Sequence, residues 1–162
     1  NHHFQRLGIH LNKELLDQAY AKFLKLADCK KDINDSDLYI IAGVTQDKHA
    51  QKIRLKYLQV VCGKNAIPMA TVKLMIDGEE CTATSSGNGP VDAAFKAVKT
   101  LVHRKINLEE YLVQAITKGT DDVGKVHIQI ENKGNIYYGF SANTDIVTAS
   151  VEAYVNAISK IL

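Results

Sequence analysis

The chain has 162 residues, of which 46% are hydrophobic and 23% charged, as is typical of a folded globular protein. The net charge is only +2, and no basic run interleaves with aromatic residues, so we expect no nucleic-acid partner. No apolar run approaches the roughly 20 residues that cross a bilayer, and the three unpatterned cysteines favour reduced thiols in a cytoplasmic protein.

The N-terminal part of the chain predicts a helical subdomain. A first helix opens at residues 11–14, and a second, short one is expected to start at Asn34 or Asp35. The apolar stripe of the first helix comprises Leu15, Leu16, Ala19, Tyr20, Phe23, Leu24 and Ala27. Residues 43–51 are polar and aperiodic, which favours a linker. We therefore assign residues 1–45 to a helical accessory and linker subdomain and residues 52–162 to a second domain.

Strands in this second domain are predicted by the alternation of apolar and polar residues. Ile53–Cys62 is the first strand, and Pro68 marks the start of the next. Two matching half-buried strands contain Val72, Leu74 and Ile76 in one place and Val126, Ile128 and Ile130 in another. Each should fold back through a hairpin, because Asp77-Gly78 and residues 132–135 tolerate positive φ.

The returning strands run into two corner segments that echo each other 55 residues apart, Ser86–Ala94 and Ser141–Ala149. After each corner the apolar period changes to about 3.6, which predicts a helix. The helical residues are Val91, Ala94, Phe95, Val98, Leu101 and Val102 in one copy and Ile146, Ala149, Ala153, Ala157, Ile158 and Ile161 in the other. Leu108–Thr117 fits either a helix or a strand, and its place in the repeat favours a strand. The predicted fold is α+β, a short helical subdomain followed by an internally duplicated βββα domain.

The two corners are candidate ligand sites, because the N–H groups at a helix N-terminus carry about half a positive charge. Pro90 suits a first helical turn, and Gly87 and Gly89 allow a ligand to approach the backbone. In the second copy the cap-type residues are Asn143, Thr144 and Asp145. The alternative is that both corners are only well-made helix caps.

An amphoteric ligand would suit such corners, with amides for its carboxylate and an acid such as Asp92 or Asp145 for its ammonium. The loop acids Asp121 and Asp122 are further candidates for the ammonium, or simply solvated. An apolar lining from Val91, Tyr111, Ala115 and Ile146 would suit a branched aliphatic side chain.

Residues for catalysis or metal binding are not apparent. The sequence has no nucleophile–base set at a recognisable spacing, no phosphate loop and no His-x-x-x-His pair. His127 alternates with apolar neighbours and is expected on the outer face of its sheet. We expect no cofactor or metal in this chain.

Three ordered blocks resemble the C-terminal half of bacterial 2-isopropylmalate synthases: Phe23–Asp28, Gly87–Ala93 and Thr144–Ser150. The similarity covers almost the whole chain and implies an allosteric dimerisation domain without its catalytic barrel. The missing initiator methionine likewise suggests a fragment of a longer protein. In that family the whole enzyme is an acyltransferase that condenses acetyl-CoA with 2-oxoisovalerate, with a divalent metal in the barrel.

The resemblance further implies that L-leucine binds this domain and inhibits the enzyme, and that the domain forms a homodimer. The implied effector-binding residues come from both corners and from the strand and loop between them: Gly87, Asn88, Gly89, Pro90, Val91, Asp92, Ala93, Leu108, Tyr111, Ala115, Val123, Ala142, Asn143, Thr144 and Asp145. In the accessory helices, Tyr20 and Tyr39 are candidates for reaching the catalytic barrel of a partner.

Two alternatives remain open. The citramalate synthases share this regulatory fold and respond to isoleucine, which differs from leucine by the position of one methyl group; such a difference is worth only about 1–3 kcal/mol in a pocket. The chain would otherwise be a ligand-free structural dimerisation module, in which the corners are caps only.

Overall fold

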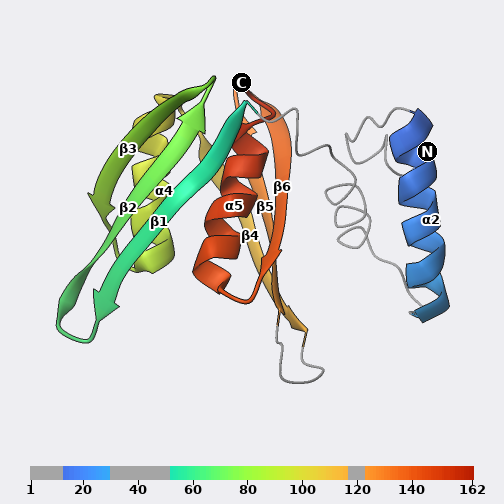
Figure 1. The fold of residues 1–162 in the computed structure, drawn as a ribbon, viewed down its shortest axis with the longest axis horizontal. Coiled ribbons are helices and arrows are strands. Elements are labelled where there is room, and N and C mark those ends of the chain that lie inside the picture. Colours follow the sequence, from blue (N-terminus) through green and yellow to red (C-terminus); the bar gives the residue numbers. More distant parts are fainter. Residues whose placement is uncertain (1–12, 30–51, 117–122) are drawn as a thin grey trace. The chain divides into compact units, whose positions relative to one another are not determined.

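The computed structural model describes residues 13–29, 52–116 and 123–162 (Figure 1). The chain divides into two compact units, Asn1–His49 and Ala50–Leu162. In the first unit, helix α2 (Lys13–Cys29) confirms the first predicted helix. Of its apolar stripe, Ala19 is buried whereas Tyr20 and Leu24 are exposed. The second predicted helix and the linker at 43–51 lie outside the described residues.

The second unit contains two three-stranded antiparallel sheets and two helices, in the order β-β-β-α-β-β-β-α. Its elements are β1 (Ile53–Gly63), β2 (Ala66–Ile76), β3 (Glu79–Ser86), α4 (Pro90–Val102), β4 (Asn107–Ile116), β5 (Val123–Asn132), β6 (Asn135–Asn143) and α5 (Ile146–Ile158). The duplicated βββα fold is therefore confirmed, and the ambiguous segment around Leu108 is a strand. Two boundaries differ from the prediction: Pro68 is the third residue of β2, and Ile161 follows the end of α5.

The two predicted hairpins close through turns of the same kind. Asp77 and Gly78 have φ values of 49° and 90°, and Lys133 and Gly134 have φ values of 52° and 82°. Positive φ at both central residues matches the right-handed twist of the flanking strands. Strand β2 thus pairs with β3, and β5 with β6.

The two copies are related by a spacing of 56 residues, one more than the echo in the sequence suggests. This spacing separates Asp77 from Lys133 in the turns, and Gly89 from Asp145 at the N-caps of the two helices. The sequence echo aligned Asn88 with Asn143 because they are identical. In the fold, Asn88 is instead equivalent to Thr144, one residue before the cap.

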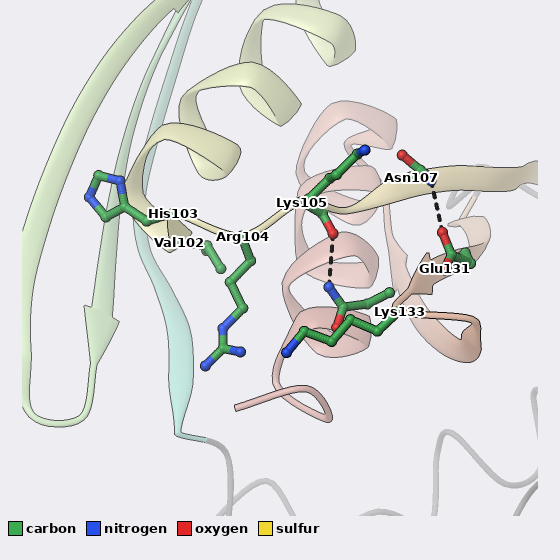
Figure 2. A pocket seen from close by; sticks show the side chains of 8 residues that line it. Val102, His103, Arg104, Lys105, Asn107, Glu131 and Lys133 are labelled. Carbon is green, nitrogen blue, oxygen red and sulfur yellow. Dashed lines mark hydrogen bonds between the residues drawn. The ribbon is translucent and has the colours of Figure 1, made fainter.

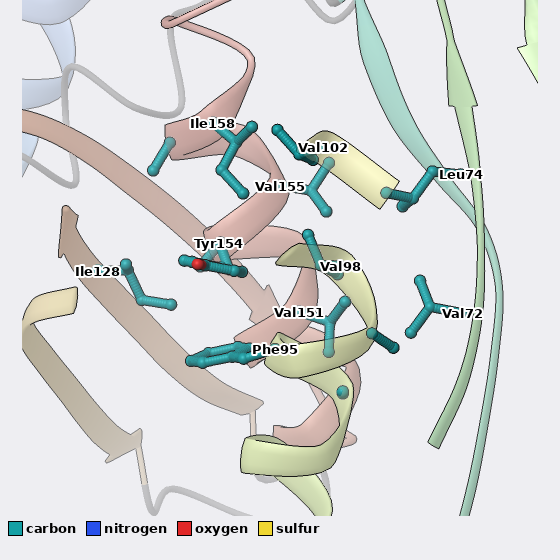
Figure 3. Close-up of a cluster of buried hydrophobic side chains, with 14 of the residues drawn as sticks. Val72, Leu74, Phe95, Val98, Val102, Ile128, Val151, Tyr154, Val155 and Ile158 are labelled. Atoms are coloured by element: carbon teal, nitrogen blue, oxygen red, sulfur yellow. The ribbon is translucent and has the colours of Figure 1, made fainter. Parts of the chain in front are cut away.

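The two helices lie between the two sheets and begin at the same end of the unit, the lower end in Figure 1. Helix α4 packs on β2 and β3, whereas α5 packs on β5 and β6 and also contacts β1. The aromatic rings of Phe95 and Tyr154 stack between the helices, with centroids 4.4 Å apart. In Figure 3, Val72 and Leu74 reach this core from the first sheet and Ile128 reaches it from the second. One core therefore serves both copies.

Small residues let the helices approach the second sheet closely. A Cβ atom at Gly139 would lie 1.8 Å from the carbonyl oxygen of Ala153, and one at Gly124 would lie 1.9 Å from Cδ1 of Ile146. Gly139 and Gly124 thus set the separation between α5 and the sheet. Among the described residues, no helix is both long enough and apolar enough to cross a membrane.

Candidate functional site

The first corner leaves the start of α4 without a side-chain cap. The N-cap residue is Gly89, with extended backbone (φ −167°, ψ 174°) and no side-chain cap hydrogen bond. Pro90 has no N–H group, so the N–H groups of Val91 and Asp92 are the first donors of the helix. An anion placed at this end would meet the positive end of the helix dipole.

The carboxylate of Asp92 is held beside this corner. It accepts hydrogen bonds from the backbone N–H of Asn88 and from Nζ of Lys96, both at 2.8 Å. These bonds, that from Lys96 first, hold the pKa of Asp92 below its ordinary value. Asp92 is thus ionised at neutral pH and tied to groups of its own helix and corner.

The two glycines of the first corner have different surroundings. A Cβ atom at Gly87 would lie 2.5 Å from the backbone nitrogen of Ala93 and 2.6 Å from Oδ2 of Asp92, so Gly87 packs against its own helix. A Cβ atom at Gly89 would meet nothing within 4 Å. Open space therefore adjoins Gly89, whereas the close approach at Gly87 is made by the protein itself.

The second corner caps its helix with its own side chain. The carboxylate of Asp145 accepts hydrogen bonds from the N–H groups of Val147 (3.1 Å) and Thr148 (3.3 Å), and from the hydroxyl of Thr148. These bonds, that from the Thr148 hydroxyl first, lower the pKa of Asp145. The side chain of Asn143 in turn accepts from the N–H of Asp145 at 3.0 Å. At this helix a carboxylate already occupies the place where an external anion would bind.

Between the corners, Tyr111 of β4 connects the two helices. Its hydroxyl lies 2.7 Å from the hydroxyl of Ser150, which donates to the carbonyl of Ile146 at 2.6 Å. Since Ser150 has a single proton to donate, Tyr111 is the donor in the first bond. The ring of Tyr111 also meets the ring of Phe95 edge-on, with centroids 6.1 Å apart. Tyr111 therefore contacts α4 and α5 from the same strand.

The inner face of β4, the face turned toward the helices, remains open. Leu108, Tyr111 and Val113 are 40%, 39% and 40% exposed. Strand pairing places them opposite Ile130, Ile128 and Val126 of β5, just as Leu55, Leu58 and Val60 of β1 lie opposite Leu74, Val72 and Ala70 of β2. The three residues of β1 pack against the core, where α5 covers them. The first copy is thus covered and the second is not.

The remaining predicted site residues are spread over both faces of the second sheet. Ala115 pairs with Gly124, which lies under Ile146 at the start of α5. Val123 and Ala142 occupy strand positions of the opposite parity and belong to the outer face, as predicted for His127. Ala93 is fully buried in the core. The second corner, Tyr111 and Ala115 thus gather around the start of α5, whereas residues 87–93 surround the start of α4.

A cavity that the sequence reasoning missed lies at the opposite ends of the helices (Figure 2). Its volume is about 620 Å³, and it is lined by Val102, His103, Arg104, Lys105, Asn107, Glu131, Asn132 and Lys133. The consecutive basic residues 103–105 could have pointed to it, although only the fold brings Lys133 beside them. In the part of the chain that the structure describes, no cluster of three His, Cys, Asp or Glu side chains could hold a metal ion.

Residues 32–162 match a protein family described as the LeuA allosteric (dimerisation) domain. The chain is also similar to proteins named 2-isopropylmalate synthase. That of Parabacteroides distasonis is 49% identical over 99% of this chain, that of Trichodesmium erythraeum 41% over 97%, and that of Prochlorococcus marinus 42% over 96%. The chain spans 29% to 32% of the length of these relatives.

Proposed function

The chain belongs to the family of LeuA allosteric (dimerisation) domains, and from this we propose that it is the regulatory region of a 2-isopropylmalate synthase that senses L-leucine. In the whole protein the condensation of acetyl-CoA with 2-oxoisovalerate would occur in a catalytic domain that this chain does not include. The chain's own task would be to bind the end product and to transmit its presence. The start of α4 carries this proposal.

The carboxylate of leucine is assigned to the start of α4. Two observations support this assignment: the N-cap residue Gly89 provides no capping side chain, and open space adjoins it. The start of α5 is not an equivalent site, because Asp145 already accepts from its first amides. A carboxylate at α4 would gain the hydrogen bonds and the dipole interaction that Asp145 gains at α5.

The aliphatic side chain of leucine is assigned to the open inner face of β4. Leu108 and Tyr111 expose apolar surface there, and Tyr111 contacts Phe95 of α4. The ring of Tyr111 is fixed by its hydrogen bond to Ser150. The ammonium group needs an acceptor, and Asp92, ionised and placed in the first turn of α4, provides one.

A second copy of the chain is assigned to the same open face. In the first copy of the repeat, α5 covers the inner row of β1, whereas the equivalent row of β4 leaves three large apolar side chains about 40% exposed. Exposed apolar groups of this kind are stabilised when a partner removes them from water. A homodimer would bury Leu108, Tyr111 and Val113 and place the leucine site beside the contact between the two chains.

Thermal melts of the chain with branched-chain amino acids test this function. A ligand that binds only the folded state stabilises it, by about 2.7 kcal/mol at a hundredfold excess over Kd. We expect L-leucine to raise Tm, and D-leucine at the same concentration to leave it unchanged.

A selective rise with L-isoleucine would instead assign the chain to a citramalate synthase. No shift with L-leucine, L-isoleucine or L-valine, in a chain that sedimentation shows to be dimeric, would leave a structural dimerisation module as the function. Turnover of acetyl-CoA by this chain alone would contradict the assignment of catalysis to another domain.

A further inference from the structure

The cavity at the C-terminal end of α4 is built from two separate segments. One is the connection from α4 to β4, including residues 103–105, and the other is the turn between β5 and β6, including Lys133 (Figure 2). Its volume of about 620 Å³ lies within the range of pockets that bind small organic molecules, roughly 300–1,000 Å³. Nothing in the proposed leucine site uses this cavity.

Two side-chain hydrogen bonds join the walls of the cavity. Asn132, which is only 6% exposed, donates to the carbonyl of Lys105 at 2.8 Å, and Asn107 donates to Glu131 at 2.8 Å. The second carboxylate oxygen of Glu131 accepts from the backbone N–H of Gly134. Because these bonds connect the two segments, the walls keep their relative positions without a ligand.

Positive charge converges in the cavity. In the view of Figure 2 the side chains of Arg104 and Lys133 extend toward the same part of the cavity, whereas His103 and Lys105 point away from it. Among the described residues neither Arg104 nor Lys133 forms an ion pair. The carboxylate of Glu131 is engaged by the neutral donors of Asn107 and Gly134. A group with negative charge would therefore gain from both cations.

We propose that this cavity binds a small phosphorylated molecule, whose phosphate group lies between Arg104 and Lys133. A guanidinium matches two phosphate oxygens at once, and an ammonium adds a point charge. A phosphate monoester carries about −1.5 to −2 charges at pH 7, which fits two cations better than a single carboxylate does. The dipole of α4 favours cations near its C-terminus. That effect accounts for Arg104 but not for Lys133, which comes from the turn between β5 and β6.

Binding of inorganic phosphate and of ADP to the 162-residue chain tests the proposal. Titrations at pH 7.5 are compared with sodium chloride of matched ionic strength and with citrate. We expect ADP and phosphate to bind where chloride does not. Arg104→Gln and Lys133→Gln should each weaken ADP binding about tenfold or more, since each removes a charge-assisted contact. Lys64→Gln, in the exposed turn between β1 and β2, removes the same charge elsewhere and should leave binding unchanged.

Three results would overturn the proposal. The first is equal binding of ADP to the wild type and to both cavity variants, which would show non-specific attraction. The second is tighter binding of citrate than of ADP, which would indicate a polycarboxylate ligand. The third is the absence of any binding of ADP or phosphate. Far-UV circular dichroism of each variant checks that a loss of binding does not reflect unfolding, and two independent variants ensure that one failure to fold leaves the test intact.

Discussion

Gly89 and Asp145 occupy the same N-cap position in two equivalent helices, yet only Asp145 caps its helix with a side chain. The repeat has thus kept the backbone of the corner and changed its chemistry. At α5 the carboxylate of Asp145 accepts from two first-turn amides. At α4 the corresponding position carries no side chain at all. This difference separates a closed helix start from one that can accept an external carboxylate.

Gly89→Asp should copy the second corner onto the first. The backbone at Gly89 is extended and a Cβ atom there meets nothing within 4 Å, so the change introduces no strain. Exchanging Gly and Asp at an N-cap alters stability by only a few tenths of a kcal/mol. The new carboxylate should nevertheless occupy the amides of α4, so that L-leucine no longer raises Tm. Gly89→Ala, which adds no acceptor, is the matched control and should keep the leucine response.

Asp145→Ala should destabilise the fold by about 1 kcal/mol at pH 7, as is typical for the loss of an N-cap. Because the folded-state pKa of Asp145 is below its ordinary value of 3.8, the ionised carboxylate stabilises the fold above that value. This contribution disappears as the pH falls through the lowered pKa. Urea unfolding of both proteins should therefore show a difference at pH 6–7 that shrinks toward pH 3. A difference independent of pH would contradict this explanation.

Gly139→Ala should be severely destabilising. Its Cβ atom would lie 1.8 Å from the carbonyl oxygen of Ala153 and 2.8 Å from the nitrogen of Ala157, both in the backbone of α5. Displacing a helix costs more than moving a side chain, so we expect a loss at or above about 3 kcal/mol, the upper end for overpacked cores. Gly63→Ala, whose Cβ has only Ala66 Cβ nearby at 3.9 Å, is the control. Similar unfolding free energies for both variants would refute the close packing of α5.

Tyr154→Phe should leave stability unchanged or raise it. The side chain is fully buried, and its hydroxyl has no hydrogen-bond partner among the described residues. Burial raises its pKa, so the hydroxyl remains neutral. Removing an unsatisfied buried hydroxyl relieves a desolvation cost of about 1–3 kcal/mol, while the ring keeps its stacking on Phe95. Chemical denaturation measures the change. A clear loss of stability would show that a group outside the described residues binds this hydroxyl.

Val113→Glu should dissociate the proposed homodimer. Val113 lies on the open inner face of β4 and is 40% exposed. A carboxylate buried at an apolar contact loses its hydration without gaining a partner. Sedimentation velocity should then detect a folded monomer. Val61→Glu is the matched control, because Val61 is 51% exposed on the outer face of the first sheet; that variant should remain dimeric.

Most of the secondary structure could be predicted because it is encoded locally. Alternation gave the strands β2 and β5, and residues that tolerate positive φ gave both hairpins. The register of the repeat was one residue short, since sequence identity matched Asn88 with Asn143 while the backbone equivalence is set by the N-caps. Local patterns contain no information about which sheet a helix covers. For that reason the contact of α5 with β1 could not be foreseen.

The candidate site was predictable only in part for the same reason. The residue types at both corners indicated helix starts, and Asp145 does cap its helix as the sequence suggested. The glycines were harder to interpret, because a glycine can make room for a ligand or for the protein's own backbone. Gly87 does the second and Gly89 leaves open space, a distinction that requires the packing of α4 to be known. The cavity beside Arg104 depends on Lys133, 29 residues farther along the chain.

The contact between α5 and β1 also affects how the domain folds. Strand β1 is the first strand to emerge during synthesis, and the helix that covers it follows all six strands in the chain. The first βββα copy therefore cannot bury its own sheet while the second is still being made. Folding must wait for contacts between residues far apart in sequence, which slows it and leaves an apolar sheet face transiently open. We expect the two copies to unfold in one cooperative transition, despite their origin as a repeat.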